Sequence, residues 1–392
     1  MNPESSLTSS ENHTAQALES LRQRFAQLPD QRQPGRTSHR LDVVLMIAVC
    51  SMLSDNGAFT EMETFARTQL PWLRTFLPIP HGVPSHDVFR NVFIMLKPAT
   101  LVGILQDWCG ELFGRHIAVD GKAMRGTIDT ATGKYQVHVL RAWVTALSLS
   151  AGQVTCAEKS NEIEALPRLL ATLRLKGAIV TIDAMGTQSA IAAQIHDAEA
   201  HYVIALKLNQ KGAFQAVSGH FDEADLAGTP PAHHHTIETS ELSHGRYERR
   251  EYTVTSALAW FHKSWKWAGL KSVVRVRRWT HRGQESAELV LETHYYLTTL
   301  PADPTLLAGY IRGHWSIENQ CHHVLDVTYQ EDHSQVRDDD AAHNLSILRE
   351  MSLHVLKRHH GKGSLRSKRK RAALDPAFRT ELLASIPHTF GA

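Results

Sequence analysis

The sequence predicts a multi-domain α/β protein in which an all-helical N-terminal region precedes a mixed sheet. Its 392 residues are roughly two to three times the usual length of one domain, so we expect more than one core. Hydrophobic residues make up 42% of the chain and charged residues 21%, as in folded globular proteins and unlike disordered chains. Strand-like and helix-like segments alternate in the middle of the chain, and this alternation indicates an α/β sheet.

The first expected elements are helices. Residues 1–16 are polar and lack apolar periodicity, so we expect a tail there. Over residues 17–110 apolar side chains recur at helical spacing, and prolines separate the helices. The apolar run 43–53 has the length of a buried helix and is too short to cross a bilayer. These residues are therefore expected to form a helical domain.

Strands are expected from about residue 115. Runs rich in Val, Ile and Leu predict strands, and segments with a periodic apolar side predict helices between them. From 211 to 300 apolar and polar residues alternate, which is typical of antiparallel strands with one face in water. Helix returns from about residue 316. The predicted strands before the alternating region are 117–119, 139–149, 178–183 and 201–207, and the predicted helices are 161–176 and 187–199.

Three features of the sequence limit the class of protein: the cysteines, the N-terminus and the charge. Cys50, Cys109, Cys156 and Cys321 lie far apart and form no CxxC pair, which argues against a structural zinc site or a disulfide framework. The N-terminus lacks a basic segment followed by an apolar one, so no signal peptide is predicted. We expect a soluble, cytoplasmic protein without a membrane partner. The formal net charge of +2 does not by itself indicate a nucleic-acid partner.

Three acidic residues stand out by their context. Asp120 follows the run 117–119, Asp183 follows 179–182, and a glycine-bearing turn comes after each. Sheets of this class bind ligands at the carboxyl ends of their strands, where two acids from neighbouring strands would share a cation. Glu318, expected in the first turn of a helix, is the third acid. Three carboxylates suit Mg²⁺, and two such ions would serve an in-line displacement at phosphorus.

Taken singly, each acid is better explained as a cap of a turn or as a charge near a helix N-terminus. Longer strings change this balance. Those in the acid-bearing part are AVDGKAMRG, NEIEALPRLL, TIDAMGTQSAIAAQI, YVIALKLNQ, HGRYERREY, RGHWSIENQ and LDVTYQED, and those nearer the N-terminus are FAQLPDQRQPGR and GVPSHDVFRNVF. In order, from about residue 18 to residue 351, the chain resembles DDE transposases of the H-repeat-associated, ISAs-type insertion sequences.

The resemblance implies a particular arrangement of domains. A ribonuclease-H-like catalytic domain would cover residues 115–356, with a β-rich insertion at about 211–300. A helical, DNA-binding domain at 17–110 would precede it, and a basic tail at 357–392 would follow. By the same resemblance the DDE triad and metal ligands, which would hold Mg²⁺ or Mn²⁺ as two ions, are Asp120, Asp183 and Glu318.

Basic and polar residues near the triad are expected to contact DNA, although an ordinary surface role is an equal alternative for those beside the strands. The C-terminal basic run would bind phosphates without reading sequence, which is compatible with a solvated tail. The expected DNA contacts are Lys122 and Arg125 after Asp120, Lys207 and Asn209 at the end of another strand, Arg312 before Glu318, and Lys368, Arg369, Lys370 and Arg371 in the C-terminal run.

Two aromatic features near Glu318 have competing interpretations. His314, Glu318 and His322 fall four residues apart, as on one side of a helix, which invites a zinc site. The HExxH spacing of zincins is absent, so a supporting role for His322 behind the ligands or near DNA is favoured. Trp315 would either stack on a flipped base or pack in the core, and the core is favoured.

The resemblance implies a transposase that binds the terminal inverted repeats of its insertion sequence, hydrolyses phosphodiester bonds at the element's ends and joins the freed 3′-hydroxyl to target DNA. Double-stranded DNA would be its partner, a homodimer its synaptic form, and the nucleoid its place in the cytoplasm. Two alternatives remain: a metal-dependent nuclease without strand transfer, and a domesticated DNA-binding protein that has lost its chemistry. The small net charge would then be an average over an acidic site and a basic C-terminal run.

Overall fold

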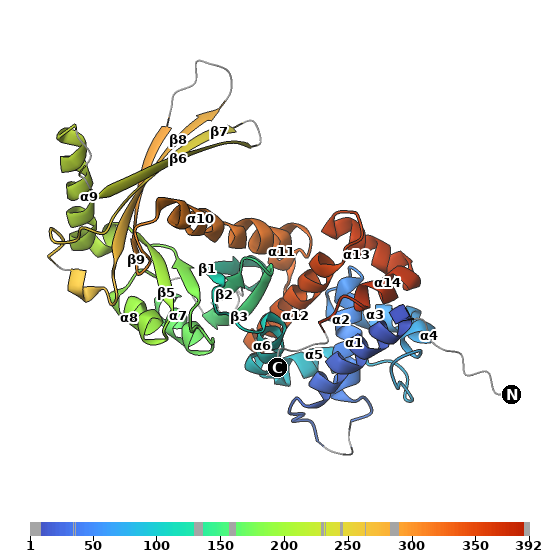
Figure 1. Cartoon of the computed structure of the whole chain (residues 1–392). Coiled ribbons are helices and arrows are strands. Elements are labelled where there is room, and N and C mark those ends of the chain that lie inside the picture. Colours follow the sequence, from blue (N-terminus) through green and yellow to red (C-terminus); the bar gives the residue numbers. More distant parts are fainter. Residues whose placement is uncertain are drawn as a thin grey trace.

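The computed structural model describes residues 9–387 except 34, 36, 129–135, 157–161, 229–230, 232, 244–245, 263 and 283–289. Figure 1 shows a sheet-bearing part on one side and a helical part, which includes the first and the last helices, on the other. Among the described residues no single helix is long and apolar enough to cross a membrane. Only the pair of helices 86–95 and 98–109, bent by 83°, passes that test on length and composition.

The helical N-terminal region is present as expected. Its first helix begins at Ser9, so residues 9–16 are helical and the expected tail is too long. All of α2 is buried, and its acid Asp42 is paired with Arg22 and Arg40 at 2.8 and 2.9 Å. The helices are α1 Ser9–Ala26, α2 Leu41–Leu53, α3 Phe59–Thr68, α4 Leu70–Leu73, α5 His86–Met95 and α6 Pro98–Cys109.

One mixed sheet of nine strands forms the other part, with the order β3-β2-β1-β4-β5-β9-β8-β7-β6. Its centre is parallel, because β1 pairs with β4 and β4 with β5 in the same direction, while the remaining pairs are antiparallel. The predicted α/β class and ribonuclease-H-like mixed sheet are confirmed. The first five strands are β1 His116–Met124, β2 Val137–Val144, β3 Leu149–Cys156, β4 Ile179–Ile182 and β5 His201–Leu206.

The segment expected as one strand over 139–149 is instead the end of β2, a turn and the start of β3. Ser148 takes a left-handed conformation in that turn, with φ 51°, where the sequence offered no glycine as a signal. Two helices follow β3 and β4, as predicted, and support the sheet. They are α7 Glu162–Ala171 and α8 Ser189–Asp197.

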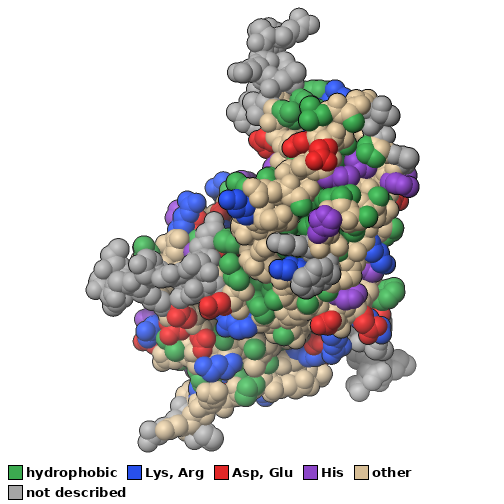
Figure 2. All heavy atoms as spheres, turned by 90° about the vertical axis from the view of Figure 1, so that its left-hand side faces the viewer, with side chains coloured by type: hydrophobic (Ala, Val, Ile, Leu, Met, Phe, Trp, Pro, Cys, Tyr) green, Lys and Arg blue, Asp and Glu red, His purple; other side chains and the backbone are tan. Residues whose placement is uncertain are grey.

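The β-rich insertion continues the main sheet instead of forming a separate one. Its last strand pairs with β5, with Val203 opposite Thr298. A helix that the alternating pattern did not predict, α9 Lys211–Leu226, precedes it. Figure 2 shows the face of the molecule that lies on the left in Figure 1. On this face basic side chains lie beside acidic ones, and several histidines are exposed. The strands are β6 His234–Ser243, β7 Arg246–Thr255, β8 Ser272–Arg282 and β9 Val290–Thr298.

Helices after the sheet join the two parts. Residues of α12 are buried from Ala341 to Leu356, because this helix packs against the sheet on one side and against α2, α5 and α6 on the other (Figure 1). Asp338 caps its N-terminus by accepting a hydrogen bond from the Ala341 N–H. The helices of this region are α10 Pro304–His314, α11 His323–Val327 and α12 Asp339–Arg358.

The C-terminal residues expected to form a basic tail are largely helical. Helices α13 Leu365–Leu374 and α14 Pro376–Leu383 pack against the N-terminal helices (Figure 1). The Arg369 guanidinium donates to the Met52 carbonyl at the end of α2, and Trp72 Nε1 donates to Thr380 at 3.0 Å. These basic residues are not a tail because arginine donors here satisfy carbonyls left free at a helix end. Composition alone does not reveal this use of arginine.

Candidate metal-dependent active site

Asp120 and Asp183 come from neighbouring parallel strands, as predicted. Val119 is opposite Ile182 in the β1–β4 register, so the next residue of each strand, Asp120 and Asp183, falls at the same level. β1 continues to Met124, however, so Asp120 lies in the middle of its strand and not at its end. Both acids line a small cavity at the point where β4 ends.

The turn after β4 holds the Asp183 side chain. Its Oδ1 accepts hydrogen bonds from the N–H groups of Met185 and Gly186, at 3.1 and 3.2 Å. Asn209, at the end of β5, donates through Nδ2 to the Ala184 carbonyl at 2.6 Å. Asn209 therefore supports the turn that carries Asp183, a role that its expected DNA contact did not include.

Glu318 lies in a π-helical turn, Glu318–His322, between α10 and α11. A helical stretch does begin at residue 316, after a turn at 315. The expectation missed α10, which begins earlier, at Pro304 behind an Asp303 cap, a signal that the sequence did contain. π-turns widen a helix locally and are frequent at functional sites. Here the turn brings His322 Nδ1 to 3.3 Å from Glu318 Oε2 and 3.4 Å from Asp120 Oδ2.

Asp120, Glu318 and His322 form a group whose ligand atoms all lie within 4.8 Å of one another, the kind of group that holds a metal ion. Asp183 lies outside this close group. Two carboxylates and a buried imidazole, with Asp183 adjacent, fit a divalent cation. Mn²⁺ accepts both oxygen ligands and an imidazole nitrogen. Mg²⁺ prefers oxygen, so it fits if the carboxylates bind it and the imidazole only supports them. The His322 Nε2 is buried and has no hydrogen-bond partner among the described residues.

Negative charge converges on Asp120. Burial, and then the Asp183 carboxylate, raise the pKa of Asp120 to about 7, and Glu318 and Glu162 act in the same direction against a hydrogen bond from the Gly121 N–H. The reason is that carboxylates in a poorly hydrated site disfavour each other's charge. A bound cation would reverse this penalty. Glu162, at the start of α7 and in the same cavity, was missed by the sequence analysis although it lies in the quoted string NEIEALPRLL.

The other two groups of this site also have shifted pKa values. A hydrogen bond from His322 lowers the pKa of Glu318, and burial lowers the pKa of His322 in spite of that bond. The His322 imidazole therefore favours its neutral form, in which a ring nitrogen is able to accept a hydrogen bond or bind a metal.

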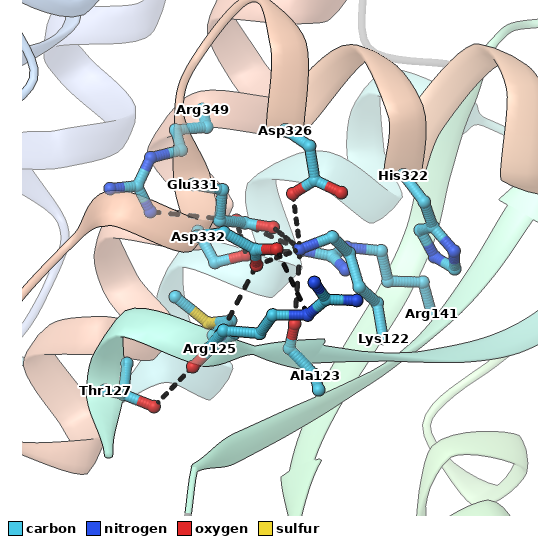
Figure 3. Close-up of polar contacts among 12 residues, drawn as sticks. Lys122, Ala123, Arg125, Thr127, Arg141, His322, Asp326, Glu331, Asp332 and Arg349 are labelled. Atoms are coloured by element: carbon cyan, nitrogen blue, oxygen red, sulfur yellow. Dashed lines mark hydrogen bonds and ion pairs between the residues drawn. The ribbon is translucent and has the colours of Figure 1, made fainter. Parts of the chain in front are cut away.

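Lys122 is held by acids of the protein (Figure 3). Its Nζ lies 2.6 Å from Asp326 Oδ1, 2.8 Å from Asp332 Oδ1 and 3.6 Å from Glu331 Oε2, and its side chain is 8% exposed. In this structure the Lys122 amine is therefore engaged by acids of the protein and is not free to contact DNA as expected. Arg125, by contrast, is 80% exposed, with its Nε 3.6 Å from Asp332 Oδ2.

A buried ionic cluster lies behind Asp120. Arg141, opposite Asp120 in the β1–β2 register, is fully buried and forms ion pairs with Glu331 and Glu350. Burial alone would raise the pKa of Glu331, but the charges of Arg141, Arg349 and Lys122 outweigh it and lower the pKa to about 2. This cluster ties β2, the segment after α11 and α12 together, and no spacing in the sequence indicated it.

The zinc interpretation, which was disfavoured, gains no support from His314, and the favoured core position of Trp315 is wrong. His314 Nδ1, at the end of α10, lies 2.9 Å from the Thr181 hydroxyl of β4, and that hydroxyl lies 2.9 Å from His116 Nε2 of β1. His314 therefore belongs to a chain of polar contacts that joins α10 to these two strands. Trp315 is 52% exposed and does not pack in the core. The turn at residue 315, before the π-helix, directs this ring to the surface.

The remaining expected DNA contacts differ in availability. Lys207 is exposed at the end of β5, and Arg312 Nη2 is paired with Glu241 Oε1 at 2.5 Å. In α13 Lys368 and Arg369 are buried, with 8% and 3% exposure, whereas Lys370 and Arg371 are exposed. Lys368 Nζ donates to the carbonyls of Leu356 and His359, so the buried pair serves packing.

Acids from two neighbouring parallel strands and from a following helix, on a mixed sheet of this order, define a DDE-type protein. The sequence model described as "Transposase DDE domain" matches residues 111–356, and the one described as "DDE_Tnp_1-associated" matches residues 22–109. The chain belongs to the DDE transposase family.

Full-length relatives are similar along nearly the whole chain. "Putative transposase YncI" of Escherichia coli O157:H7 is 32% identical over 375 residues, which are 94% of this chain and 95% of that protein. "H repeat-associated putative transposase YhhI" of Escherichia coli K12 is 31% identical over 376 residues, which are 94% of this chain and 98% of that protein. A piggyBac transposase synaptic complex aligns with a TM-score of 0.43 and 10% identity, covering 95% of this chain and 81% of that chain.

Proposed function

We propose that this chain is an active insertion-sequence transposase, which cleaves phosphodiester bonds at the terminal inverted repeats of its element and joins the freed 3′-hydroxyl to target DNA. The observation that carries the proposal is the convergence of Asp120, Asp183 and Glu318, where burial and the charges of the other two acids raise the pKa of Asp120 to about 7. Double-stranded DNA is the partner, and bringing two element ends together requires at least two copies, most simply a homodimer.

Each residue of the site has a role in this proposal. Asp120, Asp183 and Glu318 would hold two Mg²⁺ ions, or Mn²⁺, and bound ions would supply activation of the attacking oxygen and stabilisation of the leaving one. The N–H groups of Met185 and Gly186 fix the Asp183 carboxylate, and His322 orients the carboxylates of Asp120 and Glu318. Water is the first nucleophile and the DNA 3′-hydroxyl the second.

The test is a cleavage and strand-transfer assay with Mg²⁺ on DNA that carries the element's ends. We expect Asp120→Asn, Asp183→Asn and Glu318→Gln each to lower the cleavage rate by roughly a hundred-fold or more, because each removes part of the metal site. Glu199→Gln is the matched control, since that exposed acid pairs with Lys176 away from the site.

The alternatives give different results in the same assay. A nuclease without strand transfer would cut scrambled DNA as fast as end DNA and form no joined product. An inactive DNA-binding protein would bind end DNA and leave it intact. A triad variant that keeps most of the parent's cleavage rate would refute the assignment of the metal ligands.

A further inference from the structure

A groove of about 640 Å³ separates the helical N-terminal part from the catalytic part. One wall consists of residues 55–61 together with His86 and Arg90 of α5, and the other consists of segment 327–336 and residues of α13. Figure 1 shows α3, α11 and α13 near each other at this boundary. Leu345 and Arg349 of α12 also line the groove.

The acids of this groove are already engaged by the protein. Asp55 Oδ1 lies 2.8 Å from Arg369 Nη1, and Arg369 also covers the Tyr329 ring. The Glu61 carboxylate accepts hydrogen bonds from the N–H groups of Gly57 and Ala58, at 2.8 Å each, as part of the start of α3. Arg369 neutralises the Asp55 carboxylate, and the Glu61 carboxylate is turned to the backbone at the start of α3.

Two arginines of the groove have no such partner. Arg90 on one wall and Arg366 on the other are exposed, and neither side chain forms an ion pair or hydrogen bond with the described part of the chain. Arg366 lies one helical turn before the buried Arg369, on the same side of α13. The groove therefore presents unbalanced positive charge from opposite walls.

The groove is connected to the active site by one segment. Segment 327–336 follows α11 and contains Asp332, which binds Lys122 at 2.8 Å, and Lys122 is two residues beyond Asp120. A polymer lying in the groove would thus be directed along this segment toward the triad.

We propose that this groove binds the phosphate backbone of double-stranded DNA, with Arg90 and Arg366 contacting phosphates from opposite walls. The inference rests on the proposed function, because the acids at the end of the path would act on phosphodiesters. Arginine suits phosphate because its planar fork donates two parallel hydrogen bonds. Phosphate contacts of this kind position DNA and carry no sequence information.

The test measures the affinity of the full chain for end DNA and for scrambled DNA by fluorescence anisotropy across a salt series. We expect Arg90→Gln and Arg366→Gln each to weaken binding on the order of ten-fold near 0.1 M salt and to reduce the salt slope by about 1, equally on both DNAs. Arg366→Lys keeps the charge but not the fork, so it should keep the salt slope of the parent and weaken binding less than Arg366→Gln does. Lys176→Gln, which removes an exposed cation outside the groove, should change neither quantity.

The outcomes separate this inference from the proposed function. Parent protein that cleaves end DNA, together with glutamine variants that bind as tightly and with the same salt slope, would overturn the groove and leave the function standing. A loss confined to end DNA would overturn the phosphate assignment. Variants that bind both DNAs more weakly, even if the parent never cleaves, would support the groove while the proposed chemistry fails.

Discussion

Lys122 lies two residues after Asp120 in sequence, yet in the fold it is paired with other acids. Three carboxylates surround its buried amine, from Asp326, Glu331 and Asp332. Burial tends to lower the pKa of Lys122, but these carboxylates outweigh it and raise the pKa, so the amine stays charged at neutral pH. The segment after α11 is thereby attached to β1, directly beside Asp120.

We expect Lys122→Met to lower the free energy of unfolding by about 3 kcal/mol at pH 7, because it leaves buried carboxylates without their cation. Burial already raises the pKa of Asp326 and Lys122 opposes that shift, so removing the amine would raise this pKa further, and the loss should be largest at pH 7 and shrink toward pH 4. Urea denaturation at several pH values measures it. Lys176→Met, at an exposed ion pair with Glu199, should cost less than about 1 kcal/mol. Equal costs for the two variants would contradict the buried role of Lys122.

At the scale of elements, close backbone contact joins β1 to the segment after α11. A Cβ at Gly126 would lie 2.5 Å from the Ser334 carbonyl oxygen and 2.6 Å from that of Asp332. Gly126 is part of the 3₁₀ turn Arg125–Thr127, and Asp332 is part of the turn Glu331–His333. Because both oxygens belong to the backbone, a side chain at residue 126 must push the two turns apart.

Gly126→Ala is therefore expected to destabilise the protein by about 1–3 kcal/mol and to slow DNA cleavage, since it displaces Asp332 from Lys122. Thermal unfolding and the cleavage assay measure the two effects. Gly219→Ala is the control with the opposite sign, because that glycine lies within α9 with open space around it and alanine favours a helix by roughly 0.5–1 kcal/mol. Gly126→Ala with parental stability would mean that the two turns do not need this close approach.

Elements with local signals were predictable, and those set by distant contacts were not. The buried α2, strands β4 and β5 and the parallel placement of Asp120 and Asp183 followed from apolar periodicity and from strand ends. The π-turn at Glu318, the left-handed Ser148 and the contact of His322 with Asp120 depend on tertiary packing that no spacing encodes. The start of α10 did have a local signal, since Asp303 and Pro304 form a regular cap.

At the scale of the whole molecule, the two ends of the chain form one helical assembly. Arg379 Nη1 donates to Gln69 Oε1 at 3.0 Å, and its guanidinium also lies over the rings of Phe65 and Trp72. Phe378, Leu382, Leu383 and Ile386 are buried. The net charge of +2 therefore conceals a basic C-terminal run that is partly core, with other members such as Arg366 exposed.

Removing residues 364–392 is the experiment that separates packing from charge. If the C-terminal helices are part of the fold, the truncated chain should lose on the order of 5 kcal/mol of unfolding free energy, because it exposes the apolar surface that α13 and α14 cover. The double variant Lys362→Gln/Lys370→Gln removes two exposed charges and keeps the helices, so its stability should stay within about 0.5 kcal/mol of the parent. Urea unfolding followed by circular dichroism compares the three chains. If the truncated chain is as stable as the double variant, the segment is a tail that does not contribute to the fold. If only the truncation causes a large loss of stability, the N-terminal helical domain is completed by residues more than 300 positions away.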